Sequence, residues 1–319
     1  MQKVILDTDL GDDIDDALAL SFLLNLKDLE LIGVTTVFMN SDVRARIAKK
    51  ILHLSGRRDV PVYKGYSACF NGKNTNPDWQ ICQYTADLEE ARYAPENASE
   101  SADGEAAVDF IIDSVKQYGQ ELVLAAIGPF TNLAKAIEKA PEVMKNVGKI
   151  VIMGGSFFEM FREWNVLCDP EAAKILFEFP VPLYCVGTDV TWKCTLTPEQ
   201  HQYMMSFEDD TTVQGYLGRL VRLWSQSQRR LPILHDPLAI WTLVNGTHVS
   251  FKEIMVKVET QGEFTRGCTV NFDNFYRYLP EPLEGRRIFA GCEVDGEAFV
   301  SLFLSAVFEE DRKETSQIA

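Results

Sequence analysis

Six aspartates lie close together near the start of the chain, at positions 7, 9, 12, 13, 15 and 16. The mostly apolar residues 3–6 before them predict a buried strand, and residues 17–24 after them predict a buried helix. Carboxylates this close repel one another, so their pKa values rise unless a cation neutralises them. Oxygen ligands on a strand-to-helix loop suit a hard divalent ion, with Ca²⁺ or Mg²⁺ as the natural candidates. The sequence therefore predicts a metal site in this loop.

Two other uses of these aspartates can be tested against the sequence. An EF-hand loop that began at Asp7 would need Gly and Glu at its sixth and twelfth positions, which hold Asp12 and Leu18, so that interpretation fails. A metal-dependent phosphatase would use Asp7 or Asp9 as its nucleophile. Such enzymes normally have Thr or Val at the position where Gly11 stands. The phosphatase is kept as an alternative, and it predicts activity on phosphate esters.

Polar groups follow predicted strands in four separate segments, residues 7–16, 35–40, 127–132 and 154–165. In a parallel sheet these positions all fall at the carboxyl edge, where open α/β folds bind ligands. Loops are polar in general, but the convergence of four segments favours a binding site at this edge. The backbone carbonyl of Ile127 could ligate a hard ion there, because backbone oxygen is an ordinary Ca²⁺ ligand.

His235 is the best candidate for a catalytic imidazole. The chain has four histidines, at positions 53, 201, 235 and 248. A lone histidine is more often a structural residue, but His235 is followed by Asp236 and Pro237 at the predicted start of a helix. The adjacent carboxylate favours a functional interpretation of this histidine.

The elements that position these residues alternate between strand and helix for about two-thirds of the chain, which predicts βαβ units. We expect an α/β fold with a mainly parallel central sheet and helices on both faces, in one domain over residues 1–319. Ser41 is placed to cap the second helix, and the polar residues 66–103 read as a lid or a disordered segment. Strands are predicted at 29–37, 61–63, 121–127, 149–153, 181–186, 255–258 and 287–289, and helices at 41–54, 131–138, 170–177, most of 198–228, 235–244 and 295–308.

The composition of the chain argues against several kinds of partner and location. The chain has 319 residues, 46% of them hydrophobic, and a formal net charge of -16. This charge argues against a nucleic-acid polymer as partner, because phosphate binding needs clustered Lys and Arg. No apolar stretch is long enough to cross a bilayer, and the first residues form a strand pattern, so we expect no membrane contact and a cytoplasmic location. The seven cysteines show neither a CxxC pair nor zinc spacing, which predicts reduced, mostly buried thiols.

Taken together, these segments resemble the inosine-uridine-preferring nucleoside hydrolases. The resemblance runs through most of the chain, and the order and spacing of many short motifs carry it. The matching segments are residues 4–9, 33–37, 128–132, 153–155, 163–165, 169–172, 189–191, 235–239 and 265–267.

The resemblance implies a Rossmann-like nucleoside hydrolase fold and a Ca²⁺-dependent N-glycosidase that splits a ribonucleoside into ribose and free base. It also implies purine or pyrimidine salvage, and we expect a homodimer or a homotetramer. Nearby carboxylates suit this reaction, because its transition state resembles a ribosyl cation. By position, the resemblance implies that the metal ligands are Asp9, Asp16, the Ile127 carbonyl and Asp236. The residues that would bind the sugar are Asp15, Asn40, Glu163 and Asn165. The catalytic residues would be Asp9, as the general base, and His235, which falls near the departing base.

Three departures from the family pattern bear on these expectations. The aspartate loop is longer than the common short form, so Asp12 or Asp13 could replace a neighbour as ligand. Residues 156–162 lack the usual Gly-Asn pair, and residues 66–103 lack a His-Gly-rich loop. These departures leave the preferred base open and keep a second alternative, a protein that binds the nucleoside or ribose without turnover. Aromatic residues that could stack on a base are Trp79, Tyr84, Phe158, Trp164 and Trp224.

Overall fold

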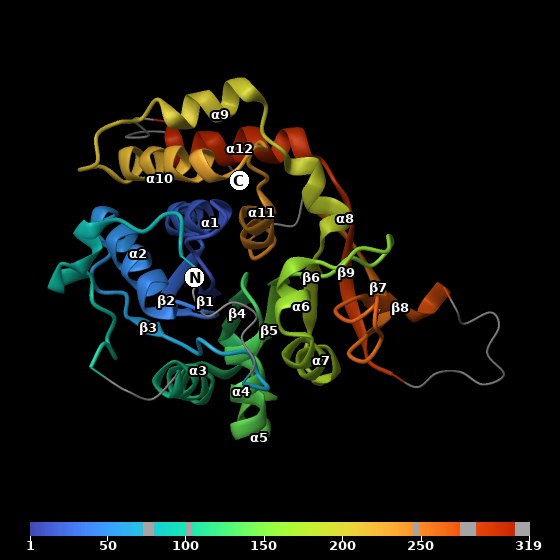
Figure 1. The fold of residues 1–319 in the computed structure, drawn as a ribbon. Coiled ribbons are helices and arrows are strands. Elements are labelled where there is room, and N and C mark those ends of the chain that lie inside the picture. Colours follow the sequence, from blue (N-terminus) through green and yellow to red (C-terminus); the bar gives the residue numbers. More distant parts are fainter. Residues whose placement is uncertain (73–79, 100–103, 245–248, 275–284, 310–319) are drawn as a thin grey trace.

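Strands from both ends of the chain meet in one nine-stranded sheet in the computed structural model (Figure 1). The structure describes residues 1–72, 80–99, 104–244, 249–274 and 285–309. The strand order is β3-β2-β1-β4-β5-β6-β9-β7-β8. The strands are β1 (Gln2–Thr8), β2 (Leu29–Thr36), β3 (Val62–Lys64), β4 (Leu122–Ala126), β5 (Lys149–Met153), β6 (Leu183–Val186), β7 (Val249–Val258), β8 (Thr269–Asn271) and β9 (Arg287–Val294).

Most neighbouring strands run parallel. The pairings from β3 through β2, β1, β4, β5 and β6 to β9 are all parallel. Among the described strands, β7 pairs antiparallel with β9 on one side and with β8 on the other. The strand order reverses direction between β1 and β4, and open α/β sheets bind ligands in the crevice at such a point.

Helices cover both faces of this sheet. Figure 1 shows α10, α11 and α12 above the sheet and α3, α4 and α7 below it. The helices are α1 (Asp15–Asn25), α2 (Ser41–Leu54), α3 (Glu105–Tyr118), α4 (Thr131–Lys139), α5 (Pro141–Met144), α6 (Trp164–Cys168), α7 (Pro170–Glu178), α8 (Thr188–Thr191), α9 (Pro198–Met205), α10 (Val213–Ser227), α11 (His235–Trp241) and α12 (Gly296–Phe308).

Alternating side chains of the central strands build a separate core on each face. On β1, Val4 and Leu6 enter the core formed with α1, α2, α10, α11 and α12, whereas Ile5 enters the core formed with α3, α4 and α7. On β4, Val123 and Leu124 divide in the same way, as the period-2 geometry of a strand requires. The predicted α/β class, with a mainly parallel sheet and helices on both faces, is confirmed.

Most predicted elements are present, and the bounds of most of them shift by one or two residues. The larger differences are that β7 starts at Val249 instead of residue 255, β9 ends at Val294 instead of residue 289, and α11 ends at Trp241 instead of residue 244.

The prediction that Ser41 caps the second helix is wrong. Ser41 is the first helical residue, Asn40 is the N-cap without a side-chain cap bond, and the Ser41 hydroxyl instead lies 3.0 Å from that of Ser67. The stretch 198–228 divides into α9 and α10, because residues 206–212 between them are not helical.

The described part of the segment 66–103 has regular structure of its own. It contains two short 3₁₀ helices, Ala86–Glu89 and Ala91–Tyr93, with Leu88 and Tyr93 buried. Lys50 of α2 forms an ion pair with Asp87 in this segment. These contacts attach the segment to α2, while residues 73–79 and 100–103 lie outside the described part. Of the helices that the structure describes, none is both long enough and apolar enough to cross a membrane.

Candidate active site

The loop between β1 and α1 is organised by a buried arginine that reaches it from α2. Arg44 is fully buried, and its guanidinium donates to the backbone carbonyls of Asp9 and Leu10 and, over 2.8 Å, to that of Phe38. Its third nitrogen lies 2.6 Å from a carboxylate oxygen of Asp12. A buried guanidinium must have its donors satisfied. Arg44 therefore fixes the backbone of the loop, and sequence analysis did not identify it.

Two of the clustered aspartates are paired with arginines. Asp12 pairs with Arg44, and Asp13 pairs with Arg230 from the other end of the chain. The side chains of Asp12 and Asp13 are 18% and 30% exposed, so both are more accessible to water than the aspartates that follow them. An arginine partner supplies the positive charge that a metal ion would otherwise supply. The extra aspartates of this long loop are therefore used in ion pairs.

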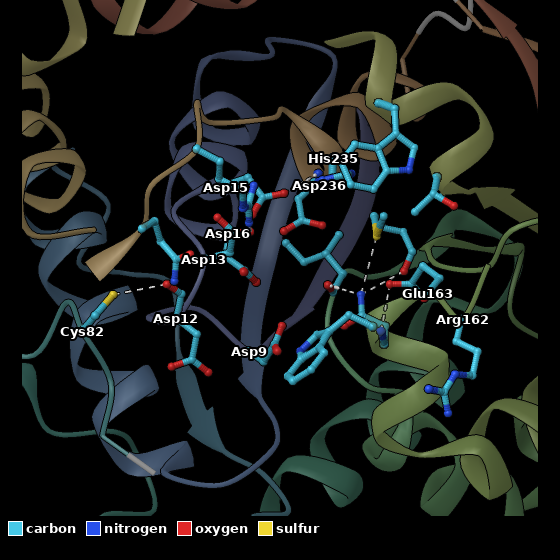
Figure 2. A pocket seen from close by; sticks show the side chains of 18 of the residues that line it. Asp9, Asp12, Asp13, Asp15, Asp16, Cys82, Arg162, Glu163, His235 and Asp236 are labelled. Atoms are coloured by element: carbon cyan, nitrogen blue, oxygen red, sulfur yellow. Dashed lines mark hydrogen bonds and ion pairs between the residues drawn. The ribbon is translucent and has the colours of Figure 1, made fainter. Parts of the chain in front are cut away.

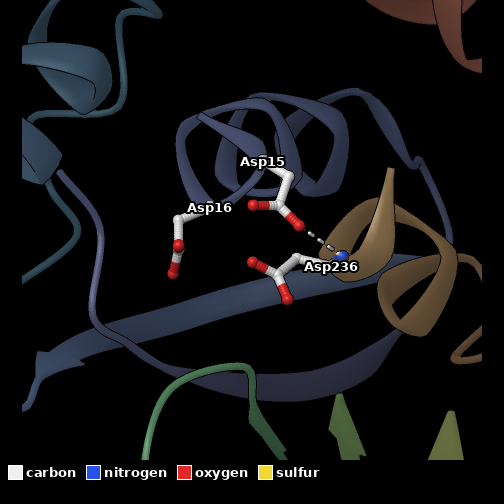
Figure 3. Close-up of side chains that lie close together, drawn as sticks. All are labelled: Asp15, Asp16 and Asp236. Atoms are coloured by element: carbon white, nitrogen blue, oxygen red, sulfur yellow. Dashed lines mark hydrogen bonds between the residues drawn. The ribbon is translucent and has the colours of Figure 1, made fainter. Parts of the chain in front are cut away.

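Three buried aspartates come together at the ends of two helices. Asp15 and Asp16 lie in the first turn of α1, Asp236 lies in the first turn of α11, and one carboxylate oxygen from each lies within 4.8 Å of the others (Figure 3). The backbone N–H of Asp236 donates to Asp15 over 3.1 Å, and the Thr8 hydroxyl donates to Asp16. Helices α1 and α11 pack against each other, which brings residues from opposite ends of the chain to one point.

Burial and mutual repulsion dominate the electrostatics of this acidic cluster. Burial raises the pKa of Asp15, Asp16 and Asp236 well above the usual range, and the neighbouring carboxylates raise it further. Burial also raises the pKa of Asp9 to about 7, although Arg44 opposes this change. Carboxylates in such a position are ionised at neutral pH when a cation accompanies them.

The donor set fits a hard divalent cation such as Ca²⁺. Carboxylate oxygens from Asp9, Asp16 and Asp236 line one cavity together with Ile127. The Ile127 carbonyl accepts a hydrogen bond of 2.8 Å from the Asn165 amide, and its second lone pair leaves it able to ligate an ion. Anionic and carbonyl oxygens are the ligands that Ca²⁺ prefers. The acidic cluster consists of Asp15, Asp16 and Asp236. It therefore contains Asp15, whereas the ligand set predicted from the sequence contains Asp9 in its place.

The cavity has a volume of about 570 Å³, within the usual range for a small-molecule site. Figure 2 shows the carboxylates of Asp15, Asp16 and Asp9 on one side of the cavity and Glu163 on the other. Asp236 and His235 close it from above in this view. Three of the four predicted segments, those after β1, β4 and β5, contribute to the lining at the carboxyl edge of the sheet, and residues after β6 do so as well. The predicted segment 35–40 contributes no residue to it.

Glu163 and Asn165 are held rigidly at the start of α6. Glu163 is the N-cap, and its carboxylate accepts from the backbone N–H groups of Gly155, Asn165 and Val166 over 2.8 to 3.1 Å. The Asn165 amide nitrogen donates to the carbonyls of Ile127 and Met153. Burial raises the pKa of Glu163, while these backbone donors lower it. Both side chains line the cavity in fixed orientations.

His235 lies against the opposite part of the cavity. Its Nδ1 is 2.6 Å from the hydroxyl of Thr191, and its ring makes an edge contact with Trp192, with centroids 5.6 Å apart. Burial lowers the pKa of His235 to about 4, so the imidazole is neutral at neutral pH. A neutral imidazole with Nδ1 accepting from Thr191 carries its proton on Nε2.

Asn40 is not among the described residues that line the cavity. Its side chain is exposed, and its backbone carbonyl accepts from the N–H of Arg44 at the start of α2. Phe38 and Met39 before it have positive φ values of 71° and 52°, which non-glycine residues rarely adopt. The structure thus brings together the other predicted site residues and leaves Asn40 outside this cavity.

The aromatic candidates divide into several groups. Trp224 is fully buried in the core, Trp79 lies outside the described residues, and Tyr84 and Phe158 are exposed but do not line the cavity. Of the four candidates that the structure describes, only Trp164 lines it. Sequence analysis missed Phe161 and Trp192, because no local pattern distinguishes a cavity-facing aromatic from a buried one.

The position of Asp7 bears on the phosphatase alternative. Asp7 is buried, and it accepts hydrogen bonds from the Thr35 hydroxyl and the Asn132 amide over 2.6 and 2.7 Å. It does not line the cavity, so it is not placed to attack a substrate there. Asp9 does line the cavity, but its carboxylate lies within an acidic cluster that would repel a phosphate group.

Comparison with known proteins agrees with the fold. The sequence profile of the inosine-uridine preferring nucleoside hydrolases matches residues 4–301. A relative described as probable uridine nucleosidase 2 from Arabidopsis thaliana is 29% identical, over 97% of this chain and 98% of that protein. The solved structure of a plant nucleoside hydrolase, PpNRh1, superposes with a TM-score of 0.81 and 26% identity, and covers 96% of this chain and 98% of that chain. A purine-preferring ribonucleoside hydrolase from Gardnerella vaginalis gives a TM-score of 0.74 and 30% identity, with the same coverage.

This chain belongs to the inosine-uridine preferring nucleoside hydrolase family. The resemblance stated from the sequence and the predicted enzyme class, a ribonucleoside hydrolase, are therefore confirmed. The relatives include a protein named for uridine and a protein named for purines, so the names alone do not select a base.

Proposed function

We propose that this protein hydrolyses the N-glycosidic bond of a ribonucleoside to give ribose and a free base, with Ca²⁺ as its cofactor, in purine or pyrimidine salvage. The observation that carries the proposal is the cavity in which Asp15 and Asp16 meet Asp236 opposite Glu163, with His235 beside them. Acidic groups at one end of the cavity suit a sugar that becomes positively charged in the transition state.

In this proposal Asp9, Asp16, the Ile127 carbonyl and Asp236 hold the ion. When bound, Ca²⁺ would orient the 2′ and 3′ hydroxyls of the ribose and make a nearby water easier to deprotonate. Asp15, which accepts from the backbone N–H of Asp236 through one oxygen, would bind a ribose hydroxyl through the other. A carboxylate can accept several hydrogen bonds at once, so both roles are compatible.

The chain's own residues carry the remaining steps. Asp9 accepts the proton of the attacking water, because a carboxylate that a cation keeps ionised can act as a general base. Glu163 and Asn165 hold the rest of the sugar, because both are fixed in place and line the cavity. Asn40 stays a predicted sugar ligand that would have to approach from outside the cavity lining. His235, neutral at neutral pH, would donate a hydrogen bond from its ring N–H to the departing base, whereas a full proton transfer would require the imidazolium form.

The test is a panel of purine and pyrimidine nucleosides assayed for free ribose with added Ca²⁺. We expect Asp9→Asn to reduce base release by at least about 100-fold, in the range typical of a lost general base, while thermal unfolding stays similar. The matched control is Asp42→Asn, because Asp42 lies in an exposed ion pair on α2 and should not affect turnover. Wild-type turnover in Asp9→Asn would remove Asp9 from the mechanism.

The same panel distinguishes the two alternatives. A protein that only binds the nucleoside or ribose would show saturable binding without release of base. A phosphatase would release phosphate from phosphate esters and would leave nucleosides intact. We also propose a cytoplasmic homodimer or homotetramer, and light scattering on the purified protein measures the subunit count.

A further inference from the structure

Three large aromatic side chains line the cavity without being buried in the core. Phe161, Trp164 and Trp192 are 46%, 51% and 50% exposed, and all three belong to the cavity lining. Apolar surface of this size normally lies in a core or marks a place where a ligand binds. Trp192 makes an edge contact with His235, Phe161 contacts Trp192, and Trp164 lies between Glu163 and Asn165 in the sequence.

The rings of Phe161, Trp192 and His235 form a continuous edge-to-face series. The centroids of Phe161 and Trp192 are 6.1 Å apart with an interplanar angle of 81°, and those of Trp192 and His235 are 5.6 Å apart, also at 81°. Edge-to-face contact is a favourable arrangement for aromatic rings. Trp192 is thus the central ring, in contact with the imidazole on one side and with Phe161 on the other.

Contacts from α8 hold this series in place before any ligand binds. Thr191, the last residue of α8, bonds to His235, and Trp192 follows it directly. Asp189 of the same helix accepts from the backbone N–H groups of Phe157 and Phe158 over 2.7 and 3.0 Å. These two bonds anchor the loop that carries Phe161. A preorganised apolar wall loses little conformational entropy when a rigid ligand packs against it.

We propose that Trp192 and Phe161 form the wall against which the base of the nucleoside packs, and that Trp192 determines which bases are accepted. This inference rests on the proposed function, because it assigns the second half of the same cavity. The cavity offers a surface to each half of a nucleoside. The carboxylates face a hydroxylated sugar, and the aromatic wall faces a planar, uncharged heterocycle. A bicyclic purine presents more ring area to the wall than a pyrimidine does, so purine nucleosides gain more from it.

The experiment compares Trp192→Leu, Trp192→Phe and Phe161→Leu with the wild type. Leucine keeps the apolar character and removes the ring, and phenylalanine keeps a ring. The matched control is Phe264→Leu, because Phe264 is 81% exposed and does not line the cavity. For each protein, KM and kcat are measured with inosine and uridine. Calorimetry measures the binding of formycin and pseudouridine, C-nucleosides whose base-sugar bond an N-glycosidase does not cleave, and the binding of ribose.

We expect Trp192→Leu to weaken binding of the C-nucleosides and to raise KM by about 3- to 10-fold, which matches one aromatic contact, with the larger effect on the purine-like compounds. Phe161→Leu should give a smaller change in the same direction, and Trp192→Phe should recover most of the wild-type affinity. Affinity for ribose should stay unchanged in all variants, because ribose has no base. The Phe264→Leu control should behave as the wild type.

Several results would overturn the proposal. They are unchanged affinity and KM in Trp192→Leu, an equal loss of affinity for ribose and for nucleosides, or no binding of C-nucleosides to the wild type. If the wild type releases no base, the proposed function fails, and calorimetry with the C-nucleosides still decides whether Trp192 contacts a base. If circular dichroism shows that Trp192→Leu is unfolded, Trp192→Phe and Phe161→Leu supply the comparison.

Discussion

Neighbouring aspartates of one loop have different charge partners, and these partners separate their roles. Asp12 and Asp13 are neutralised by Arg44 and Arg230, whereas Asp15 and Asp16 face another carboxylate. Aspartates only a few positions apart in the sequence therefore belong either to an ion pair or to a candidate metal site. The difference arises from side-chain direction, since successive residues of a loop or helix point to different sides.

The acidic site could be predicted from residue types, but its internal division could not. Carboxylates clustered after a strand predicted a cation site, the His-Asp-Pro sequence pointed to His235, and the family resemblance added Asp236 as a ligand. Arg44 and Arg230 were missed, because each meets the loop only after the chain has folded. The same applies to Thr191, whose contact with His235 spans 44 positions. Such contacts follow from the packing of elements and leave no local signal.

The contact between Thr191 and His235 gives a prediction at this scale. We expect Thr191→Val to reduce kcat for nucleosides by roughly 10- to 100-fold, because the imidazole loses the bond that fixes its tautomer and orientation. Thr191→Ser retains the hydroxyl and should recover most of the activity. Steady-state kinetics with 4-nitrophenyl β-D-riboside provides the control, because its phenolate leaves without a proton. An equal loss on that substrate would show that Thr191 supports the site as a whole.

The functional carboxylates lie at the N-terminal ends of helices. Asp15 and Asp16 occupy the first turn of α1, and Asp236 occupies the first turn of α11. Carboxylates near helix N-termini are stabilised by the free N–H groups and by the helix dipole. The two helices therefore offset part of the electrostatic cost of collecting three buried carboxylates.

Element prediction succeeded where burial and periodicity agreed and failed where tertiary contacts decided the outcome. The strand at Lys149–Met153 matches its prediction, because its near-continuous apolar run has one interpretation in a parallel sheet. Strand β7 is ten residues long, whereas only residues 255–258 were predicted. Its first half has exposed polar residues at Ser250 and Glu253, and pairing with β9 holds it in place. The expected cap at Ser41 failed for a similar reason, because that hydroxyl meets Ser67.

Arg44 of helix α2 holds the acidic loop in place. This contact gives a prediction at the scale of the element. We expect Arg44→Met to lower the free energy of unfolding by about 3–5 kcal/mol, because Asp12 loses its partner and three backbone carbonyls lose a donor. Arg46→Met on the same helix removes a more exposed pair with Asp42 and should cost less than about 1 kcal/mol. Denaturant unfolding of both variants measures the difference. Equal stabilities would show that Arg44 is not needed to hold the loop.

The whole molecule brings distant parts of the chain to one cavity. Strand β1 pairs with β2 on one side and with β4 on the other, so the loops after β1 and β4 leave the sheet at its switch point. Helix α11 then packs against α1 and adds Asp236 and His235. The predicted convergence of residues near the start of the chain with residues beyond 230 is present in the structure.

We expect the buried carboxylates to make the stability of the whole molecule depend on pH and, through the proposed ion, on Ca²⁺. Folding raises the pKa of Asp7 and Asp9 to about 7, above the value in an unfolded chain. The folded protein therefore holds these protons more tightly than the unfolded chain does. This difference adds to the free energy of unfolding at low pH, and the contribution is lost as pH rises through about 7. In the presence of a chelator we therefore expect a lower Tm at pH 8 than at pH 5.5, by roughly 5 °C or more.

Added Ca²⁺ should raise the Tm more at pH 8 than at pH 5.5, because the ion binds the ionised carboxylates. Differential scanning fluorimetry measures all four conditions, and Mg²⁺ at the same concentration is the control for ion type. A Tm that does not depend on pH under chelation, together with no shift on adding Ca²⁺, would contradict a buried acidic metal site.

The position of β9 has a consequence for how the chain is made. Strand β9 lies between β6 and β7 in the sheet but follows both of them in the sequence. While the ribosome is still synthesising the last strand, β7 and β8 have no partner through which to join the rest of the sheet. In the nascent chain, β7 and β8 must therefore stay separate from the rest of the sheet, as a two-stranded ribbon. They join it when residues Arg287–Val294 emerge and insert beside β6.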